Sequence, residues 1–360
     1  MVYHTQNTFT SLKIIDSSCR DGPDGPWASF NMTVSGTGSK EDLGQTFRTF
    51  PGLSFSILLV PIAAEFCSGS RILEESCVSR NNFQSNASTS WKSIGEINIL
   101  SVLPLSRFLA AGNATTQSEQ LGDDTVFMGS GETAPGLVQQ IVAGVASKQF
   151  FMGLFGLSNR ELYLYGHSRP TFLSIFKEYT LPSLSFSYTA GSFRNNTTPP
   201  SLVLGGFDAS RFDSQSTLQV DITDNAALWT TYPFYVNLTS ISFTGFEKTW
   251  PHRADSLGSV AIYIDSAIPQ IWLPLSACQV FEDVFGLEWN DTAQLYLINS
   301  TMHDRLQRLN TTITLSLHSS RNGSTVRNFT LPYSAFDLKV TYPLVDIESF
   351  YFPPGNAHIR

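Results

Sequence analysis

The asparagines of this chain give its clearest chemical signal. Eleven of the 18 Asn begin an Asn-x-Ser/Thr triplet, the acceptor for N-linked glycans. Ser and Thr make up roughly a fifth of the chain, so chance would give about four such triplets. The excess predicts a glycosylated surface; the alternative is that a chain rich in Ser and Thr often contains the triplet. The eleven are Asn31, Asn86, Asn113, Asn195, Asn196, Asn237, Asn290, Asn299, Asn310, Asn322 and Asn328.

Other chemistries lack the residues that they need. The six His are scattered singly, so the clustered His and Cys ligands of a metal site are missing. The sequence contains no Gly-x-Ser-x-Gly motif, no Gly-rich phosphate loop, and no motif that places a His beside a Ser or Cys nucleophile. We therefore expect neither a metal nor a cofactor.

The four cysteines agree with an oxidising compartment. Cys67 and Cys77 are close enough in the sequence to close a local loop. Cys19 and Cys278 are either a second bridge or two buried thiols.

Charge and hydropathy exclude two classes of partner. The formal net charge is -8, and no stripe of basic residues is present, so we expect no nucleic acid partner. No run of 18 apolar residues exists, so we expect no membrane span. The first residues show no signal peptide, which conflicts with the eleven triplets. We resolve the conflict by suspecting an incomplete N-terminus or a trimmed chain, and we expect a secreted, extracellular or cell-surface protein.

The elements that must position any site are mostly strands. With 360 residues the chain is about twice the usual domain length, which favours two lobes. Many short strands and few helices favour a mainly β fold of sandwich or barrel lobes. Short apolar or alternating runs predict strands at 53–60, 97–103, 125–128, 151–157, 184–188, 202–204, 234–244, 260–264, 271–273, 311–317 and 336–340. Helical periodicity predicts helices at 168–179, 276–285 and 301–309.

Nine motifs follow one another in a specific order along the chain. They are Gly25–Phe30, Leu59–Pro61 followed by Cys67, Phe83–Trp91, Asp124–Val126, Phe151–Leu157, Phe172–Lys177, Leu202–Phe212, Ala261–Ile268 and Trp272–Pro274. Each is weak alone, but in this order and at these spacings they resemble the pepsin-like aspartic proteases (peptidase A1). The nearest resemblance is to the glycosylated group from filamentous fungi.

The resemblance implies a bilobal, mainly β fold, the pepsin-like double β-barrel with a central cleft. It divides the chain into an N-terminal extension (1–24), an N-terminal lobe (25–200) and a C-terminal lobe (201–360). The two glycan triplets and the Pro-Pro pair within 191–201 predict a loop-rich hinge at the boundary between the lobes. The resemblance places the strand at 151–157 beneath the 53–61 region, and it implies a disulfide between Cys67 and Cys77. It also implies a monomer that takes a peptide, or a cell-wall polymer, in its cleft.

Relatives in this family continue past the equivalent of Phe352-Pro353-Pro354 into an apolar-apolar-Gly strand beneath the second catalytic turn. No such strand precedes Arg360, so we expect an incomplete C-terminal lobe. Many of the fungal relatives then continue into a membrane anchor, which is likewise missing from the sequence.

Family members work with two aspartates on equivalent turns, each within Asp-Thr/Ser-Gly. One carboxylate activates water as a general base and the other, protonated, polarises the scissile carbonyl. The second turn is partly intact, because Asp265 and Ser266 supply the carboxylate and the hydroxyl while Ala267 replaces the glycine. Asp265 is either a surviving catalytic residue or an inherited structural acid, hydrogen-bonded to its own turn.

The first turn has no acid. Counting back from Leu59-Val60-Pro61 places 52–54 (Gly-Leu-Ser) at the Asp-Thr/Ser-Gly positions, and no aspartate occurs between Asp42 and Asp123. Asp42-Leu43-Gly44 imitates the motif, but the preceding Ser-Lys-Glu cannot form a buried strand. Glu65 falls after the strand. Asp123 and Asp124 lie in a later strand, where the family uses the residue structurally.

The flap tyrosine of active relatives is missing too, since no tyrosine occurs between Tyr3 and Tyr163. The resemblance therefore implies a secreted glycoprotein that is catalytically inactive, with a peptide-binding type of cleft that holds Asp265 as its single carboxylate. The alternative is an acid-active aspartic-type endopeptidase that uses Asp265 and an unrecognised second acid, with Asp42 and Glu65 the first candidates. A third alternative is a truncated product with no folded function.

Overall fold

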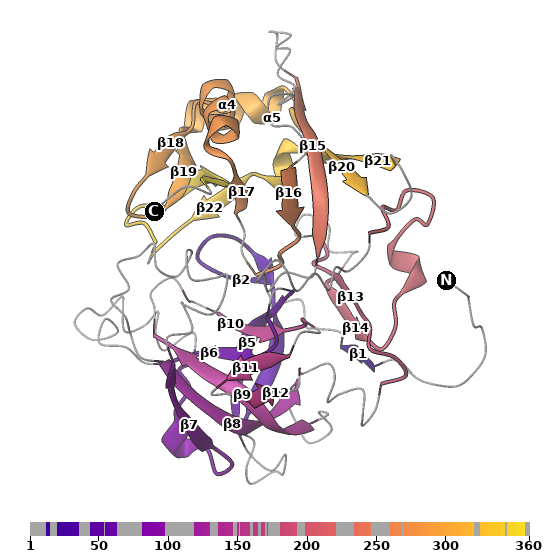
Figure 1. Ribbon diagram of the computed structural model, residues 1–360. Coiled ribbons are helices and arrows are strands. Elements are labelled where there is room, and N and C mark those ends of the chain that lie inside the picture. The colour runs from indigo at the N-terminus through magenta and orange to yellow at the C-terminus, as the bar shows by residue number, and fades with distance from the viewer. Residues whose placement is uncertain are drawn as a thin grey trace.

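The computed structural model is mainly β, as predicted. It describes residues 12–14, 20–35, 44–53, 55–62, 81–97, 119–129, 136–146, 150, 152–158, 161–164, 167–169, 171, 181–192, 199–220, 234–245, 260–267, 270–319, 325–342 and 344–356. In Figure 1 the N-terminal strands, indigo to magenta, fill the lower part of the view, and the C-terminal strands and helices, orange and yellow, fill the upper part.

The N-terminal strands close into a barrel. A seven-stranded sheet has the order β4-β5-β10-β6-β9-β8-β7, and an additional pairing of β4 with β8 closes six of these strands into a ring, with β7 on the outside of β8. The bounds are β4 (Phe30–Val34), β5 (Gln45–Gly52), β6 (Leu58–Pro61), β7 (Lys92–Ile97), β8 (Glu119–Met128), β9 (Gly136–Val145) and β10 (Gly153–Gly156).

The strand predicted to pass beneath the 53–61 region does so. β10 runs parallel to β5 and antiparallel to β6, and is buried along its whole length. Beyond the ladders, the backbone N–H of Gly156 donates to Ile57 O at 2.9 Å and that of Leu157 donates to Gly52 O at 2.8 Å. Backbone hydrogen bonds therefore hold the loop between β5 and β6 against the end of β10.

The C-terminal strands form open ladders. One four-stranded sheet has the order β16-β15-β20-β21, a second has the order β18-β19-β23-β22, and β17 pairs in parallel with β24. Among the described residues these ladders do not close into a second barrel. Their bounds are β15 (Tyr235–Thr244), β16 (Val260–Tyr263), β17 (Ile271–Leu273), β18 (Glu288–Asn290), β19 (Leu295–Ile298), β20 (Thr312–Ser319), β21 (Thr325–Pro332), β22 (Leu338–Val340), β23 (Ser349–Phe352) and β24 (Pro354–Asn356).

Two predicted helices are confirmed. α4 (Leu275–Phe285) buries its apolar stripe, including Phe281 and Phe285, and ends at Gly286, whose φ of 59° is the left-handed conformation that glycine adopts without strain. α5 (Ser300–Arg308) begins after Asn299, whose side chain accepts a hydrogen bond from the N–H of Met302 at 2.9 Å. The short 3-10 turns are η2 (Ser85–Ala87), η4 (Ala209–Arg211) and η6 (Tyr333–Ala335).

Two predicted elements differ from the structure. The helix predicted from Ser168 is wrong at its start, because β12 (His167–Arg169) pairs there with β11 (Leu162–Leu164); its remainder lies mostly outside the described residues. The strand predicted over 53–60 begins only at Leu58. Its first half is the turn whose backbone groups bond to β10, so a continuous apolar run was misread as continuous strand.

The predicted boundary near residue 200 lies between two paired strands. β14 (Ser201–Leu204) pairs with β13 (Phe186–Thr189) and with β1 (Leu12–Ile14). Leu202 and Leu204 belong to the same buried apolar cluster as Phe30 and Phe155 of the barrel. Residues just past the predicted hinge therefore pack with the N-terminal strands.

A hairpin at the start of the barrel reaches the C-terminal sheet. It is formed by β2 (Arg20–Asp21) and β3 (Trp27–Ala28), and its tip residues Pro23 and Asp24 accept hydrogen bonds on their carbonyl oxygens. The N–H of Thr341 donates to Pro23 O at 2.7 Å, and the hydroxyl of Tyr351 donates to Asp24 O at 2.6 Å. These bonds link segments more than 300 residues apart.

The side chain of Asp24 is buried at this contact. Its Oδ1 accepts a hydrogen bond from Trp27 Nε1 at 2.8 Å, but burial dominates and raises the pKa of the carboxyl from 3.8 to about 6. The titratable group that faces it is Tyr351, whose own pKa is raised by burial and by the nearby Asp24. Asp21 of the same hairpin is instead paired with Arg48 at 3.1 Å.

We predict that this carboxyl makes the protein more stable in acid. Between pH 4 and 6 the folded protein binds a proton at Asp24 that the unfolded chain has lost, so the free energy of unfolding falls as pH rises through this window. The pKa difference corresponds to a loss of about 3 kcal/mol, complete above pH 6. Denaturant unfolding at pH 4 and pH 7 should show this loss, and Asp24→Asn should remove it.

The matched control is Asp283→Asn, at an exposed position of α4, which should keep the pH dependence of the parent protein. An Asp24→Asn protein with an unchanged difference between pH 4 and pH 7 would contradict the assignment.

Candidate functional site

Two turns from distant parts of the chain meet at the candidate site. One turn follows β5 and the other follows β16, and the hydroxyl of Ser266 in the second donates a hydrogen bond to the carbonyl oxygen of Pro51 at the end of β5. Next to it, Ala267 packs against a buried apolar cluster of the barrel that contains Phe55 and Leu59. The family resemblance implies two equivalent turns, and the structure brings these two turns into contact.

Asp265 is held by its own turn. Its Oδ1 accepts a hydrogen bond from the backbone N–H of Ala267 at 2.8 Å, and its side chain is half-buried. The methyl group of Ala267 does not prevent this bond, because it is directed into the apolar cluster of the barrel. A carboxylate fixed in this way is pre-oriented, as both the catalytic and the structural interpretation of Asp265 require.

On the other turn, Gly52 has no room for a side chain. A Cβ atom added at Gly52 would lie 2.2 Å from two ring carbons of Phe55, far inside van der Waals contact. Phe55 is itself buried in the barrel cluster with Leu121 and Leu154. The space beside Gly52 that a carboxylate-bearing side chain would use is filled by an aromatic ring.

The strand beneath this turn also needs a glycine. A Cβ atom at Gly156 would lie 2.4 Å from the carbonyl oxygen of Phe55, which is backbone and cannot easily move. The apolar-apolar-Gly pattern of β10 therefore has a local cause, the close approach of Gly156 to the turn.

Asp124 has the structural role that was predicted for it. Its buried carboxylate accepts hydrogen bonds from Ser88 Oγ at 2.8 Å, from Ser90 Oγ, and from the N–H of Thr125 at 2.7 Å. Because both serines belong to the segment before β7, Asp124 fastens that segment to β8. All the described hydrogen bonds of the carboxylate are to this segment and to its own strand.

Several predicted site residues lie outside the described residues. They are the two alternative acids Asp42 and Glu65, the predicted disulfide partners Cys67 and Cys77, and most of the flap stretch between Ile97 and Leu121. The disulfide and the flap stay predictions.

Cys278 is a buried thiol rather than half of a disulfide, which is one of the two alternatives for it. Its Sγ lies 3.7 Å from Leu273 O, and burial raises the pKa of the thiol to about 11. The neighbouring Tyr296 donates its hydroxyl to Glu282 at 2.6 Å, and burial raises the pKa of that phenol as well. A thiol that stays protonated and covered is a packing residue, not a nucleophile.

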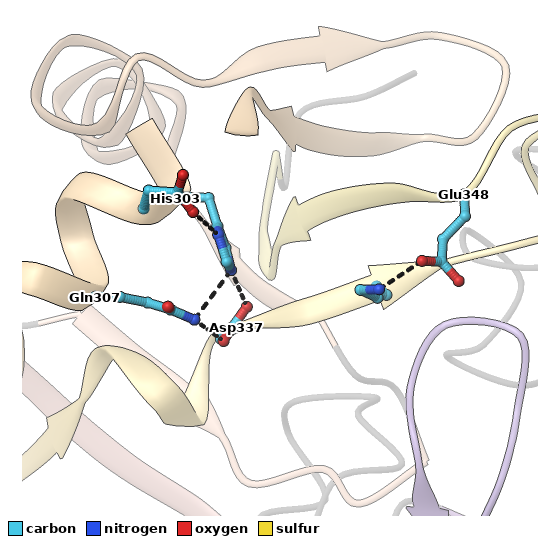
Figure 2. Close-up of polar contacts among 6 residues, drawn as sticks. His303, Gln307, Asp337 and Glu348 are labelled. Carbon is cyan, nitrogen blue, oxygen red and sulfur yellow. Dashed lines mark hydrogen bonds and ion pairs between the residues drawn. The ribbon is translucent and has the colours of Figure 1, made fainter. Parts of the chain in front are cut away.

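The sequence did not predict a buried His–Asp contact in the C-terminal half, which Figure 2 shows. His303 Nε2 lies 2.7 Å from Asp337 and its Nδ1 lies 3.3 Å from Asp304, while Gln307 donates to the second oxygen of Asp337 at 3.0 Å. The imidazole stacks on Phe350 with centroids 3.8 Å apart. Both ring nitrogens are engaged by carboxylates, so this contact fastens α5 to the segment before β22.

An exposed tyrosine pair next to the second turn was also missed. Tyr235 and Tyr263 lie opposite each other on β15 and β16, with ring centroids 4.3 Å apart and hydroxyls joined at 2.9 Å. Both strands that carry these tyrosines were predicted from the sequence. The register that places the two rings opposite each other follows only from the tertiary structure.

The described glycan acceptors lie mainly at the surface. Asn86, Asn299, Asn310 and Asn328 are exposed, while Asn31, Asn237 and Asn290 are half-buried. The side-chain oxygens of four of the seven accept hydrogen bonds. The donors are Arg48 to Asn31 at 2.7 Å, Ala293 to Asn290 at 2.8 Å, Met302 to Asn299 at 2.9 Å and Ser316 to Asn328 at 2.9 Å. The remaining four, Asn113, Asn195, Asn196 and Asn322, lie outside the described residues.

Comparison of the chain with protein-family models and with curated protein sequences finds no match. Within the part of the chain that the structure describes, no helix is long and apolar enough to cross a membrane. The same residues contain no cluster of three or more His, Cys, Asp or Glu that could hold a metal ion.

The bond between the two turns should contribute measurably to stability. Ser266→Ala removes the only side-chain donor to Pro51 O among the described residues, and we expect the free energy of unfolding to fall by about 1 kcal/mol. Ser276→Ala, at an exposed position of α4, is the control and should change it little. Equal unfolding free energies of the two variants would show that the turns do not depend on this bond.

The packing of Phe55 against Gly52 can be tested with a double-mutant cycle. Gly52→Ala should lower the free energy of unfolding by about 1–3 kcal/mol, because the new methyl group collides with the ring. Phe55→Leu replaces the ring with a smaller side chain. In this background Gly52→Ala should lower the free energy of unfolding by less than it does in the parent protein. Additive costs in the double variant would mean that the ring does not occupy this space.

Proposed function

We propose that this chain is a secreted, glycosylated protein of the pepsin-like bilobal fold that no longer cleaves peptide bonds and instead holds an extended peptide between its lobes. The family assignment rests on the order of the nine motifs in the sequence. The structure supports it in three ways: the closed N-terminal barrel, the strand β10 beneath the first turn, and the contact between the first and second turns.

One observation carries the inactive assignment. Ser266 donates to the residue directly before Gly52, and the space beside Gly52 is filled by the ring of Phe55. In the proposed fold this position carries the first catalytic aspartate. The substitution is therefore accommodated by packing, since an apolar side chain has taken the volume of the lost carboxylate.

The loss of activity follows from the different roles of the two carboxylates in the family mechanism. In the family mechanism one carboxylate takes a proton from water while the second donates one to the peptide carbonyl. The first turn supplies neither group, because residues 44–64 contain no Asp or Glu. Peptide hydrolysis is slow without catalysis, and losing one member of a catalytic unit costs several powers of ten in rate.

A second candidate function is acid-active proteolysis through Asp265. It is favoured by the geometry of the second turn, where the carboxylate keeps its hydrogen bond to the N–H of residue 267. It requires a second acid from another segment, of which Asp42 and Glu65 are the nearest in sequence to the first turn.

Purified protein should leave an unfolded protein substrate intact at about pH 3–5, the range in which carboxylate pairs of this kind work. The measurement is cleavage with and without pepstatin, with Asp265→Asn as the matched variant. The parent protein and Asp265→Asn should show the same low level of cleavage, with or without pepstatin. Pepstatin-sensitive cleavage that disappears in Asp265→Asn would overturn the inactive assignment and favour the second candidate.

A further inference from the structure

The exposed tyrosine pair lies on the same sheet face as a predicted glycan acceptor. β15 and β16 lie side by side as an antiparallel pair (Figure 1). In their register Tyr235 is opposite Tyr263, and Asn237 is opposite Ala261. Side chains two residues apart on a strand point to the same face, so Tyr235 and Asn237 are neighbours on it. Asn237 begins one of the Asn-x-Thr triplets that predict a glycan.

This face is directed away from the core. The alternate side chains of β15, those of Val236 and Leu238, are 4% and 3% exposed, and Leu238 packs in the apolar cluster of the C-terminal half. Asn237 therefore projects from the opposite side of the sheet, where it is half-buried. Ala261, directly across from it, is small and exposed, so solvent reaches the position beside the Asn237 amide.

The two rings form one aromatic surface of fixed geometry. Their centroids are 4.3 Å apart, their planes are inclined by 57°, and the hydroxyl of Tyr235 donates to that of Tyr263 at 2.9 Å. Tyr263 is nevertheless 40% exposed. Because each ring already holds the other, a group that packs on the pair orders little further side-chain freedom.

The spacing fits the first sugar of an N-linked glycan. Two residues along a strand span about 7 Å, which separates Asn237 from Tyr235. Tyr263 is the diagonal neighbour of Asn237 on the adjacent strand, and such neighbours lie about 7–8 Å apart. An N-acetylglucosamine ring and its amide link bridge a distance of this size. The face of an aromatic ring carries partial negative charge, and the C–H groups of the sugar carry partial positive charge.

We propose that the glycan of Asn237 packs on the rings of Tyr235 and Tyr263, and that this contact stabilises the sheet that carries them. The inference rests on the proposed function, because it needs a secreted, glycosylated chain, but it does not depend on the lack of proteolysis. It explains why two rings are paired at a solvent-facing position of the sheet, where exposed apolar surface has no partner in the protein core.

The test is a double-mutant cycle on the full chain, secreted from eukaryotic cells, with the occupancy of each acceptor first measured by mass spectrometry of glycopeptides. Asn237→Gln removes the glycan, and Tyr235→Val removes the ring but keeps a residue that favours strands. Asn237→Gln should raise the equilibrium constant of unfolding about threefold or more in the parent protein, and much less in the Tyr235→Val background.

Two measurements attribute this coupling to the first sugar. Trimming the glycans to one N-acetylglucosamine with an endoglycosidase should leave the coupling unchanged. Thr239→Ala removes the glycan by a second route, because it destroys the triplet and keeps Asn237. The Thr239 hydroxyl also donates to Ser316 O at 2.9 Å, so this variant has a cost of its own, but its coupling to Tyr235→Val should equal that of Asn237→Gln.

The matched control is Asn328→Gln on the same sheet. Through the pairings of Asn237 with His318 and of His318 with Val326, Asn328 lies on the same face as Asn237. It is an exposed acceptor, but the residue two positions before it is Val326 and offers no ring. Asn328→Gln should therefore show no coupling to Tyr235→Val.

The outcomes separate this inference from the proposed function. Glycans at Asn86 and Asn328 with none at Asn237 would overturn the inference and leave the proposed function standing. A glycan at Asn237 without coupling to Tyr235 would also overturn it, as would coupling that appears with Asn237→Gln but not with Thr239→Ala. A chain without glycans at any acceptor would overturn the glycosylated, secreted assignment itself, and the inference with it.

Discussion

The hydrogen bond from Ser266 to Pro51 is the contact on which the candidate site depends. It joins the end of a barrel strand to a turn more than 200 residues later, and it fixes which residues of the two turns face each other. Because the acceptor is a backbone carbonyl, the hydrogen bond does not depend on the side chain at position 51. The two turns are therefore in contact although the first turn has no acid.

The first turn has no acid, and the space beside Gly52 is closely packed. An aspartate at this position would need a polar pocket. Here the ring of Phe55 lies against Gly52, and its neighbours Leu121 and Leu154 are apolar and buried. A carboxylate at position 52 would now face desolvation as well as a clash.

Much of the fold was predictable from the sequence where periodicity is unambiguous. β17 and the two helices α4 and α5 match their predicted bounds within one residue, because short apolar runs and amphipathic stretches are bounded there by proline, glycine or a capping asparagine. The predictions failed where an apolar run contains a turn, as at 53–57, and where a helical pattern begins within a strand, as at Ser168. In both cases the local structure depends on hydrogen bonds to another strand. The periodicity of apolar residues carries no information about such pairings.

The candidate site was predictable only in part, for the same reason. The sequence shows that residues 44–64 contain no Asp or Glu and that Asp265 and Ser266 follow the strand at 260–264. The ring of Phe55 beside Gly52 cannot be seen in the sequence, since it depends on how the turn folds over β10. The His303–Asp337 contact and the Tyr235–Tyr263 pair likewise join residues that are about 30 positions apart and carry no motif.

The halves of the molecule are held together by two contacts that respond differently to pH. The turn contact through Ser266 involves no titrating side chain and is insensitive to pH. The hairpin contact at the tip of β2 and β3 places the buried carboxyl of Asp24 against Tyr351, and it favours the protonated, neutral form. Acid therefore strengthens the second contact and leaves the first unchanged. The contacts between the two halves are therefore strongest in acid, where the Asp24 carboxyl is protonated.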